Sequence, residues 1–274
     1  MKPLLRPATS DLEIPRNVDD LTLRVGSVPV KLTHLQKVFW PNLRLTKRDL
    51  LQYYVDVSPW LLPHLKNRAM VMKRYPNGIA GEFFFMKRAP SPRPSSIPIC
   101  SIEHSSGNVI GFPVIQHLAS LLWVVNLGCI DLNPWYARCG DVHRPDYLHF
   151  DLDPVEGTSF ERVLETALIV RDALAELKIP SYAKTTGSRG IHVYVPIARG
   201  PLQKQVWEFA KVFPRKSRSG IRKSLRPSIV WRSAQLGTSL SITTRMRGTA
   251  RWHRCIQCGR NPPRPFRRPS PGRK

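Results

Sequence analysis

The chain has 274 residues, and its 43 lysines and arginines against 19 aspartates and glutamates give a formal net charge of +24. Its longest apolar stretch, residues 118–130, contains Asn126 and is too short to cross a bilayer, which excludes a membrane-spanning protein. Five scattered cysteines exclude a disulfide framework and predict a cytoplasmic location.

The start of the chain predicts a flexible lead-in. Residues 1–24 are polar near their beginning and interrupted by prolines, which also argues against a signal peptide. Residues 25–213 are long enough to bury a substantial core, and we expect them to form one incomplete α/β domain. Within this domain, residues 118–130 predict a buried helix or strand, and the proline-rich residues 91–98 predict a surface loop.

Two aspartates in residues 146–154 are the most informative feature for function. Apolar and polar residues alternate there, which predicts a strand that carries both carboxylates on one face. Neighbouring carboxylates repel each other unless a cation lies between them, as in polymerases. The spacing of Asp151 and Asp153 therefore suits a divalent metal, although a strand that merely ends in a solvated loop at Pro154 would show the same pattern.

A helix and a glycine-containing turn follow the aspartates. Residues 158–161 have the pattern of a capping box, and apolar residues continue at helical spacing as far as Leu177. Residues 185–190 then combine two glycines with hydroxyl groups and Arg189, which could hold a triphosphate. A glycine turn or a lone histidine such as His192 is more often structural. Their order, strand, helix, turn and strand, nevertheless predicts an α/β active-site unit.

Motifs in a fixed order extend from about Lys31 to Val212. They resemble the polymerase domain of bacterial DNA ligase D, an archaeo-eukaryotic-primase-type polymerase of DNA end joining. The resemblance implies a primase-polymerase fold with an RRM-like catalytic sheet, and template-dependent nucleotidyl transfer. It also implies that the chain binds double-stranded DNA ends with a 5′-phosphate and uses NTP or dNTP. The implied protein partners are Ku and a DNA ligase, and the implied location is with the nucleoid. The motifs include Lys37-Val-Phe-Trp-Pro41, Leu45-Thr-Lys-Arg-Asp-Leu50, Phe83-Phe-Phe-Met-Lys87, Asn133-Pro-Trp135 and Gln205-Val-Trp-Glu-Phe-Ala210.

The resemblance also implies roles for single residues. Asp151 and Asp153 would bind catalytic Mn²⁺ or Mg²⁺, Lys37 and Lys47 would receive the 5′-phosphate of a DNA end, and Phe85 would stack on a template base. Taken without the resemblance, the two lysines would be ordinary solvated residues and Phe85 a core residue. One nucleotide-site position departs from the family, where several relatives carry histidine in place of Asn133. The implied nucleotide-binding residues are Lys73, Arg74, Asn133, Thr186, Ser188 and His192.

The last quarter of the chain departs from the family. Residues 209–274 contain 18 lysines and arginines and no aspartate or glutamate, so the family's third metal-binding aspartate is missing. Codons chosen for Leu240–Arg247 can be regrouped in one shifted frame to read L-D-Y-N-Q-N-A, the segment that carries this aspartate in the family. Residues 224–237 and 251–260 regroup to further family segments in the same frame. We therefore predict that residues 214–274 are a basic, out-of-frame and disordered tail, and that the fold is truncated.

Three functional hypotheses stay open at this point. The chain is a nucleotidyltransferase impaired by loss of the third carboxylate, or a non-catalytic DNA-end-binding protein, since Lys37, Lys47 and Phe85 all precede the frame change near Phe213. The third hypothesis is a non-functional pseudogene product, because a missing strand would leave backbone groups unpaired. A zinc site at Cys255 and Cys258 is disfavoured, because no second pair of ligands has finger spacing.

Overall fold

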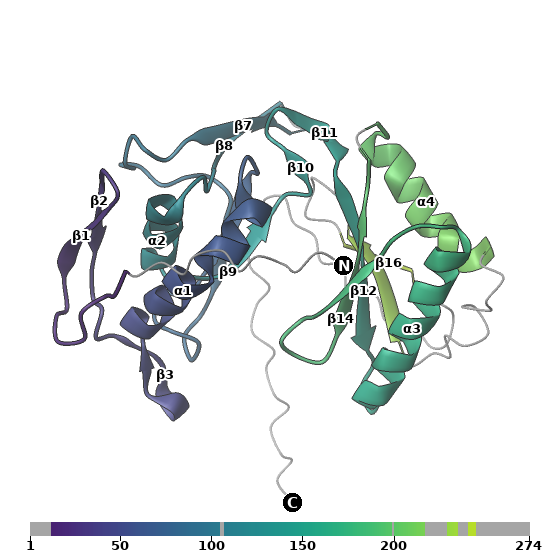
Figure 1. Ribbon diagram of the computed structural model, residues 1–274, viewed down its shortest axis with the longest axis horizontal. Helices are drawn as coiled ribbons and strands as arrows, with labels where there is room; N and C mark the ends of the chain where they lie inside the picture. The colour runs from purple at the N-terminus through teal and green to yellow at the C-terminus, as the bar shows by residue number, and fades with distance from the viewer. Residues whose placement is uncertain (1–11, 105–106, 199, 217–228, 235–240, 245–274) are drawn as a thin grey trace, which may run out of the picture. The chain divides into compact units, whose positions relative to one another are not determined.

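The computed structural model describes residues 12–104, 107–198, 200–216, 229–234 and 241–244. The chain forms two compact units, one of residues 1–148 and 195–208, the other of residues 149–194 and 209–274. Both units combine helices and strands (Figure 1), which confirms the predicted α/β class. Within the described ranges, every helix is too short or too polar to span a bilayer.

The first unit consists of two helices and several small antiparallel sheets. Strand β5 lies between β6 and β9 in a three-stranded sheet, and the other strands form the pairs β1-β2, β3-β4, β7-β8 and β10-β11. Its elements are β1 (Leu21–Val25), β2 (Val28–Leu32), β3 (Val38–Trp40), the 3-10 helix η1 (Pro41–Leu43), β4 (Leu45–Thr46), α1 (Lys47–Leu65), β5 (Met70–Arg74), β6 (Phe84–Met86), β7 (Ile99–Glu103), β8 (Val109–Pro113), α2 (Leu118–Asn126), β9 (Cys129–Pro134), β10 (Ala137–Arg138) and β11 (Asp141–Pro145).

Helix α1 begins at a capping box that its sequence encodes. Asp49 Oδ2 accepts a hydrogen bond from Thr46 N at 2.8 Å, and Thr46 Oγ1 accepts one from Asp49 N at 3.4 Å. The apolar face of α1 is buried with α2 in one core that contains Leu51, Val55 and Leu121. The long apolar stretch 118–130 is divided between α2 and β9 by Gly128, at a positive φ of 80°.

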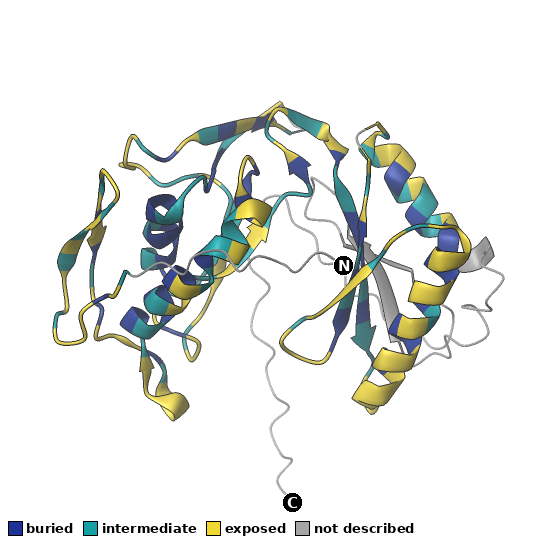
Figure 2. Ribbon diagram, viewed as in Figure 1, coloured by how far each residue is buried: buried dark blue, intermediate teal, exposed yellow. Residues whose placement is uncertain are grey.

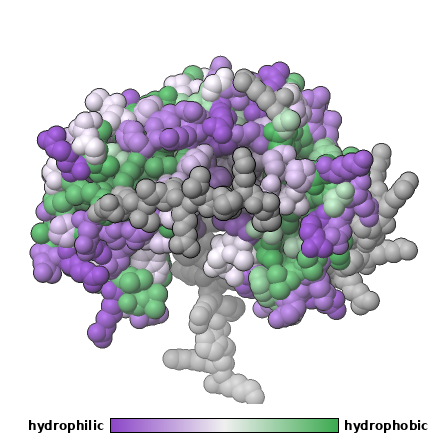
Figure 3. All heavy atoms as spheres, viewed as in Figure 1, coloured by the Kyte–Doolittle hydropathy of each residue, from purple (hydrophilic) through white to green (hydrophobic). Residues whose placement is uncertain are grey.

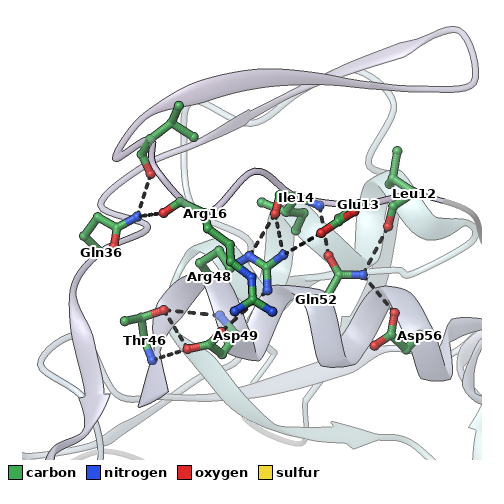
Figure 4. A network of polar contacts seen from close by, with 11 residues as sticks. Leu12, Glu13, Ile14, Arg16, Gln36, Thr46, Arg48, Asp49, Gln52 and Asp56 are labelled. Carbon is green, nitrogen blue, oxygen red and sulfur yellow. Dashed lines mark hydrogen bonds and ion pairs between the residues drawn. The ribbon is translucent and has the colours of Figure 1, made fainter. Parts of the chain in front are cut away.

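The described part of the expected lead-in, residues 12–24, contacts helix α1 of the first unit. Figure 4 shows the contacts that bind it to α1. Arg48 Nε donates to Ile14 O at 2.8 Å, Gln52 Oε1 accepts from Ile14 N at 2.9 Å, and Gln52 Nε2 donates to Leu12 O at 3.1 Å. Ile14 is fully buried. The segment is held by polar side chains one turn apart on α1, an interaction that its own composition does not reveal.

The second unit is built on a five-stranded sheet. The strand order is β13-β14-β12-β15-β16, and helices α3 and α4 lie against one face of the sheet (Figure 1). Phe150 of β12 stacks on Phe213 of α4 at 5.4 Å between ring centroids. The strands and helices of this sheet are β12 (Tyr147–Pro154), α3 (Phe160–Glu176), β13 (Tyr182–Thr185), β14 (Ile191–Pro196), α4 (Gln203–Lys216), β15 (Ile229–Ala234) and β16 (Ser241–Thr244). The unit boundary crosses three of them, so that residues 147–148, 195–196 and 203–208 are counted with the first unit.

Helix α3 differs from its prediction in two respects. It is capped by Ser159 without a side-chain hydrogen bond, so the capping box predicted at Thr158 is wrong. Its apolar residues are also divided between two faces. Figure 2 shows the division into buried and exposed residues, and Figure 3 shows hydrophobic spheres at the surface over α3. Val163, Val170 and Leu174 are buried, whereas Phe160, Leu164 and Leu168 are 41%, 43% and 49% exposed.

Part of the segment predicted to be a disordered tail is regular. Helix α4 continues to Lys216, and β15 pairs with β12 in an antiparallel register that places Arg232 opposite Asp151 and Val230 opposite Asp153. The backbone of β12 therefore has a neighbour on this side. Residues 217–228, 235–240 and 245–274, including the two tail cysteines, lie outside the described residues. The out-of-frame origin of the tail stays a prediction.

Candidate functional site

The two aspartates lie on one face of β12, as the alternation predicts. Phe150 and Leu152 are fully buried on the opposite side of the strand. The Asp151 side chain is 20% exposed. Gly190 lies directly against Asp153, because a Cβ atom added to Gly190 would be 2.7 Å from Asp153 Oδ1 and 2.9 Å from Leu152 O. Any larger residue at position 190 would force the turn and the carboxylate apart.

Three further side chains surround Asp151. His192 Nε2 lies 3.3 Å from Asp151 Oδ1, and His192 Nδ1 lies 3.4 Å from Tyr194 Oη. The imidazole of His149 stacks on His192 at 4.5 Å between centroids. Burial and the neighbouring His192 lower the pKa of His149 to about 3, so His149 is neutral near pH 7. Burial and the Asp151 carboxylate raise the pKa of Tyr194.

The glycine turn is organised by Thr186. Its Oγ1 accepts hydrogen bonds from Ser188 N at 3.3 Å and Gly190 N at 3.2 Å, and Thr186 N donates to Gly190 O at 3.1 Å. Gly187 adopts a positive φ of 82°, which glycine tolerates without strain. Thr186 therefore shapes the turn, whereas Ser188 and Arg189 are exposed at the surface.

The chemistry of the aspartate face fits a divalent cation held loosely. Two carboxylates supply the hard oxygen ligands that Mg²⁺ and Mn²⁺ prefer. Among the residues that the structure describes, no group of three or more histidine, cysteine, aspartate or glutamate side chains could hold a metal ion. An ion bound by Asp151 and Asp153 alone would keep most of its water ligands.

In the first unit, the predicted phosphate-binding lysines are neighbours with different environments. Lys47 N donates to Lys37 O at 2.8 Å, which joins the two backbones. Lys47 is buried and its Nζ donates to Thr33 O at 2.6 Å, while the exposed Lys37 Nζ donates to Asn77 Oδ1 at 2.8 Å. Burial and the charge of Lys37 lower the pKa of Lys47 to about 8.

Lys73 lies in an aromatic and acidic cluster on the β6-β5-β9 sheet. Its Nζ is 3.1 Å from Asp131 Oδ2 and lies over the rings of Phe83, at 4.3 Å from the centroid, and Tyr75, at 5.3 Å. Phe85 stands opposite Lys73 in the register of β5 and β6 and is 58% exposed. An exposed ring beside a cation suits base stacking better than a place in the core.

The other two predicted nucleotide contacts of this unit are more engaged with the protein. Arg74 Nε donates to Leu127 O at 2.7 Å, and its guanidinium lies 5.2 Å from the ring centroid of Phe84. Asn133 Nδ2 donates to Asp131 O at 3.2 Å. Both side chains therefore have partners within the protein, in addition to the nucleotide contacts predicted for them.

The structure thus gathers the predicted residues into two sets, one in each unit. Asp151, Asp153, Thr186, Ser188 and His192 belong to the second unit, and Lys37, Lys47, Lys73, Arg74, Phe85 and Asn133 to the first. The residue-level reasoning missed Tyr194 and His149 around the aspartates, and Asp131 and Tyr75 around Lys73. Side chains two residues apart on a strand share a face, and this rule, applied to β12 and β14, could have identified His149 and Tyr194.

Comparisons with known proteins agree on one family. The sequence profile described as the LigD primase-polymerase domain matches residues 46–229. The multifunctional non-homologous end joining protein LigD of Mycolicibacterium smegmatis is 36% identical over 171 residues, which are 62% of this chain and 22% of that protein. The bifunctional non-homologous end joining protein LigD of Bacillus subtilis is 32% identical over 169 residues, 62% of this chain and 27% of that protein. The chain therefore spans about a quarter of the length of these relatives.

A solved structure is similar over most of the chain. The polymerase domain of Mycobacterium tuberculosis ligase D, determined in complex with DNA, superposes with a TM-score of 0.66 at 28% identity. The superposition covers 72% of this chain and 74% of that domain. The primase-polymerase fold predicted from the sequence is thereby confirmed.

Proposed function

This chain belongs to the LigD primase-polymerase domain family, and on that premise we propose that it is a DNA-end-binding polymerase module of non-homologous end joining. The observation that carries the proposal is the joint placement of Asp151 and Asp153 on one strand face, with the glycine turn packed against Asp153. A carboxylate pair beside a turn with exposed hydroxyl and guanidinium groups suits a nucleoside triphosphate and its metal.

Each part of the site has a defined task in this proposal. Asp151 and Asp153 would hold Mn²⁺ or Mg²⁺, which when bound activates the primer 3′-hydroxyl and neutralises the charge of the triphosphate. Ser188 and Arg189 contribute donors to the nucleotide phosphates, while Thr186 fixes the turn that presents them. His192 lies beside the Asp151 carboxylate and would contact the bound nucleotide.

The first unit would hold the DNA. Lys37 and Lys47 supply two charges for a 5′-phosphate, and Phe85 offers its exposed ring to a template base. Lys73, held by Asp131, would contribute a positive charge to bind phosphate in the first unit. A double-stranded DNA end with a 5′-phosphate and an NTP or dNTP are the proposed ligands. Because the full-length relatives are end-joining proteins, we extend the proposal to Ku and a DNA ligase as partners in the cytoplasm.

We further propose that nucleotidyl transfer by this chain is impaired. Two metal ions close together need a third carboxylate to offset their repulsion. The β15 residues that stand opposite Asp151 and Asp153 are Arg232 and Val230, and nothing acidic follows Glu208 in the sequence. A non-catalytic DNA-end-binding protein is the second candidate, favoured by the lack of any cluster of three metal ligands within the described residues.

Binding to defined DNA ends separates specific end recognition from simple charge attraction. We expect a recessed end with a 5′-phosphate to bind more tightly than the same end with a 5′-hydroxyl, by about 1–3 kcal/mol for each charge-assisted contact. Lys37→Ala should reduce this preference, whereas Lys66→Ala, another lysine of the first unit, should not. Equal affinity for both ends in the folded wild-type chain would refute the proposed role of the two lysines.

A second measurement addresses the aspartates. Paramagnetic broadening by Mn²⁺ should centre on Asp151 and Asp153 and should be lost in the Asp151→Ala, Asp153→Ala double variant. Broadening that persists unchanged in the double variant would mean that the ion binds elsewhere.

A further inference from the structure

His192 is held on three sides by residues of the second unit. Its Nε2 lies 3.3 Å from Asp151 Oδ1, its Nδ1 lies 3.4 Å from Tyr194 Oη, and its ring stacks on the buried ring of His149 at an interplanar angle of 28°. Tyr194 and His192 are two apart on β14 and therefore project from the same face. The surroundings of His192 thus constrain the plane of its ring and which of its two nitrogens carries the hydrogen.

The proton positions on His192 follow from the chemistry of its neighbours. An ionised carboxylate can only accept hydrogen bonds, so an unprotonated Nε2 would place two lone pairs 3.3 Å apart at Asp151. The neutral ring therefore carries its hydrogen on Nε2, and Nδ1 is an acceptor. The only one of these three neighbours that stands at Nδ1 with a proton to donate is the hydroxyl of Tyr194.

We propose that Tyr194 is a positioning residue that fixes His192 in the tautomer whose Nε2–H faces Asp151. Its hydroxyl donates to Nδ1 and thereby acts, through the imidazole, on a carboxylate proposed to hold the metal. Partners of this kind commonly determine the tautomer and orientation of histidines beside metal sites. The catalytic meaning of the contact rests on the proposed function, whereas the hydrogen-bond arrangement does not.

The tautomer can be read directly by NMR. In the full chain labelled with ¹⁵N-histidine, His192 in its neutral form should show a protonated Nε2 and an unprotonated Nδ1. A His192→Gln variant identifies its signals. Tyr194→Phe keeps the ring and removes the hydroxyl, and should convert this single tautomer into a mixture. The remaining histidine signals report in the same spectrum whether the variant is folded.

Tyr182 provides a matched control. It stands opposite Tyr194 in the β13–β14 register but is 65% exposed, so Tyr182→Phe should leave the His192 signals unchanged. Free Mn²⁺ measured by electron paramagnetic resonance gives a second readout. Tyr194→Phe should weaken Mn²⁺ binding by about threefold to tenfold, the loss expected for one uncharged hydrogen bond, and Tyr182→Phe should not.

The outcomes distinguish this inference from the proposed function. A wild-type His192 with its proton on Nδ1, or a Tyr194→Phe variant with the wild-type tautomer, would overturn the inference. A wild-type chain that binds no Mn²⁺ would remove the support for the proposed metal site, but the tautomer of His192 in the wild type and in Tyr194→Phe would still decide the inference.

Discussion

Lys47 and Lys37 are joined by a backbone hydrogen bond of 2.8 Å, yet only Lys47 has its ammonium group buried. The Nζ of Lys47 donates to the carbonyl oxygen of Thr33. Burial and the charge of Lys37 lower the pKa of Lys47 to about 8. A phosphate placed beside both lysines would supply negative charge and reduce the repulsion between their two positive charges.

The first prediction concerns the pH dependence of DNA-end binding. If Lys47 contacts the 5′-phosphate as proposed, the phosphate would stabilise the charged form of Lys47, and binding above pH 8 would require proton uptake and weaken as pH rises. The preference for a phosphorylated end should fall between pH 8 and pH 9, by up to about tenfold, the limit for linkage to one proton. Lys47→Arg does not titrate in this range and should retain its preference. A wild-type preference that stays constant to pH 9 would show that Lys47 does not contact the phosphate.

The second prediction concerns the close approach of Gly190 to Asp153. Gly190→Ala places a Cβ 2.7 Å from Asp153 Oδ1 and 2.9 Å from the carbonyl oxygen of Leu152, which is backbone and cannot rotate away. We expect a loss of about 1–3 kcal/mol in the free energy of unfolding, together with weaker Mn²⁺ binding. Gly140→Ala has nothing within 4 Å of the added carbon and serves as control. Chemical denaturation and Mn²⁺ titration of both variants check this, and a Gly190→Ala variant that matches the wild type would contradict it.

The third prediction concerns the anchoring of the N-terminal segment by α1. Arg48→Met removes the donor to the carbonyl of Ile14, a fully buried residue, and should lower the free energy of unfolding by about 1–3 kcal/mol. Arg88→Met removes a similar donation to Val109 O at the surface and should cost much less. Amide hydrogen exchange should accelerate at Ile14 in the first variant alone. Unchanged protection at Ile14 would show that the segment is held by other contacts.

Local sequence patterns predicted the aspartate strand, because a period of two is a property of the strand itself. They did not predict that His192 and Tyr194 lie beside Asp151, since that contact requires β14 to be the neighbour of β12. These two strands are separated in the sequence by helix α3, strand β13 and the glycine turn. The contacts of the segment 12–24 with α1 were not predicted for a related reason. Its anchors, Arg48 and Gln52, lie more than thirty residues away on α1.

Burial was also difficult to predict for individual residues. Lys47 is charged and begins a helix, which usually means exposure, but Thr33 O, just after the end of β2, provides an acceptor for its ammonium group. Phe85 was assigned to stacking only through the family resemblance, since an apolar run around it also suits a core strand. Its exposure of 58% reflects its place on β6, at the edge of a three-stranded sheet.

The most direct test of the central claim is gap-filling extension of a primer on DNA with a 5′-phosphorylated downstream end. We predict little or no extension by the chain as written, and restored extension after the reading frame is corrected near codon 213, because in the proposed frame the correction would return a third carboxylate to the site that contains Asp151 and Asp153. The Asp151→Ala, Asp153→Ala double variant of the corrected chain should again be inactive. Robust template-dependent extension by the uncorrected chain, or activity in the corrected chain that survives loss of both aspartates, would contradict this account.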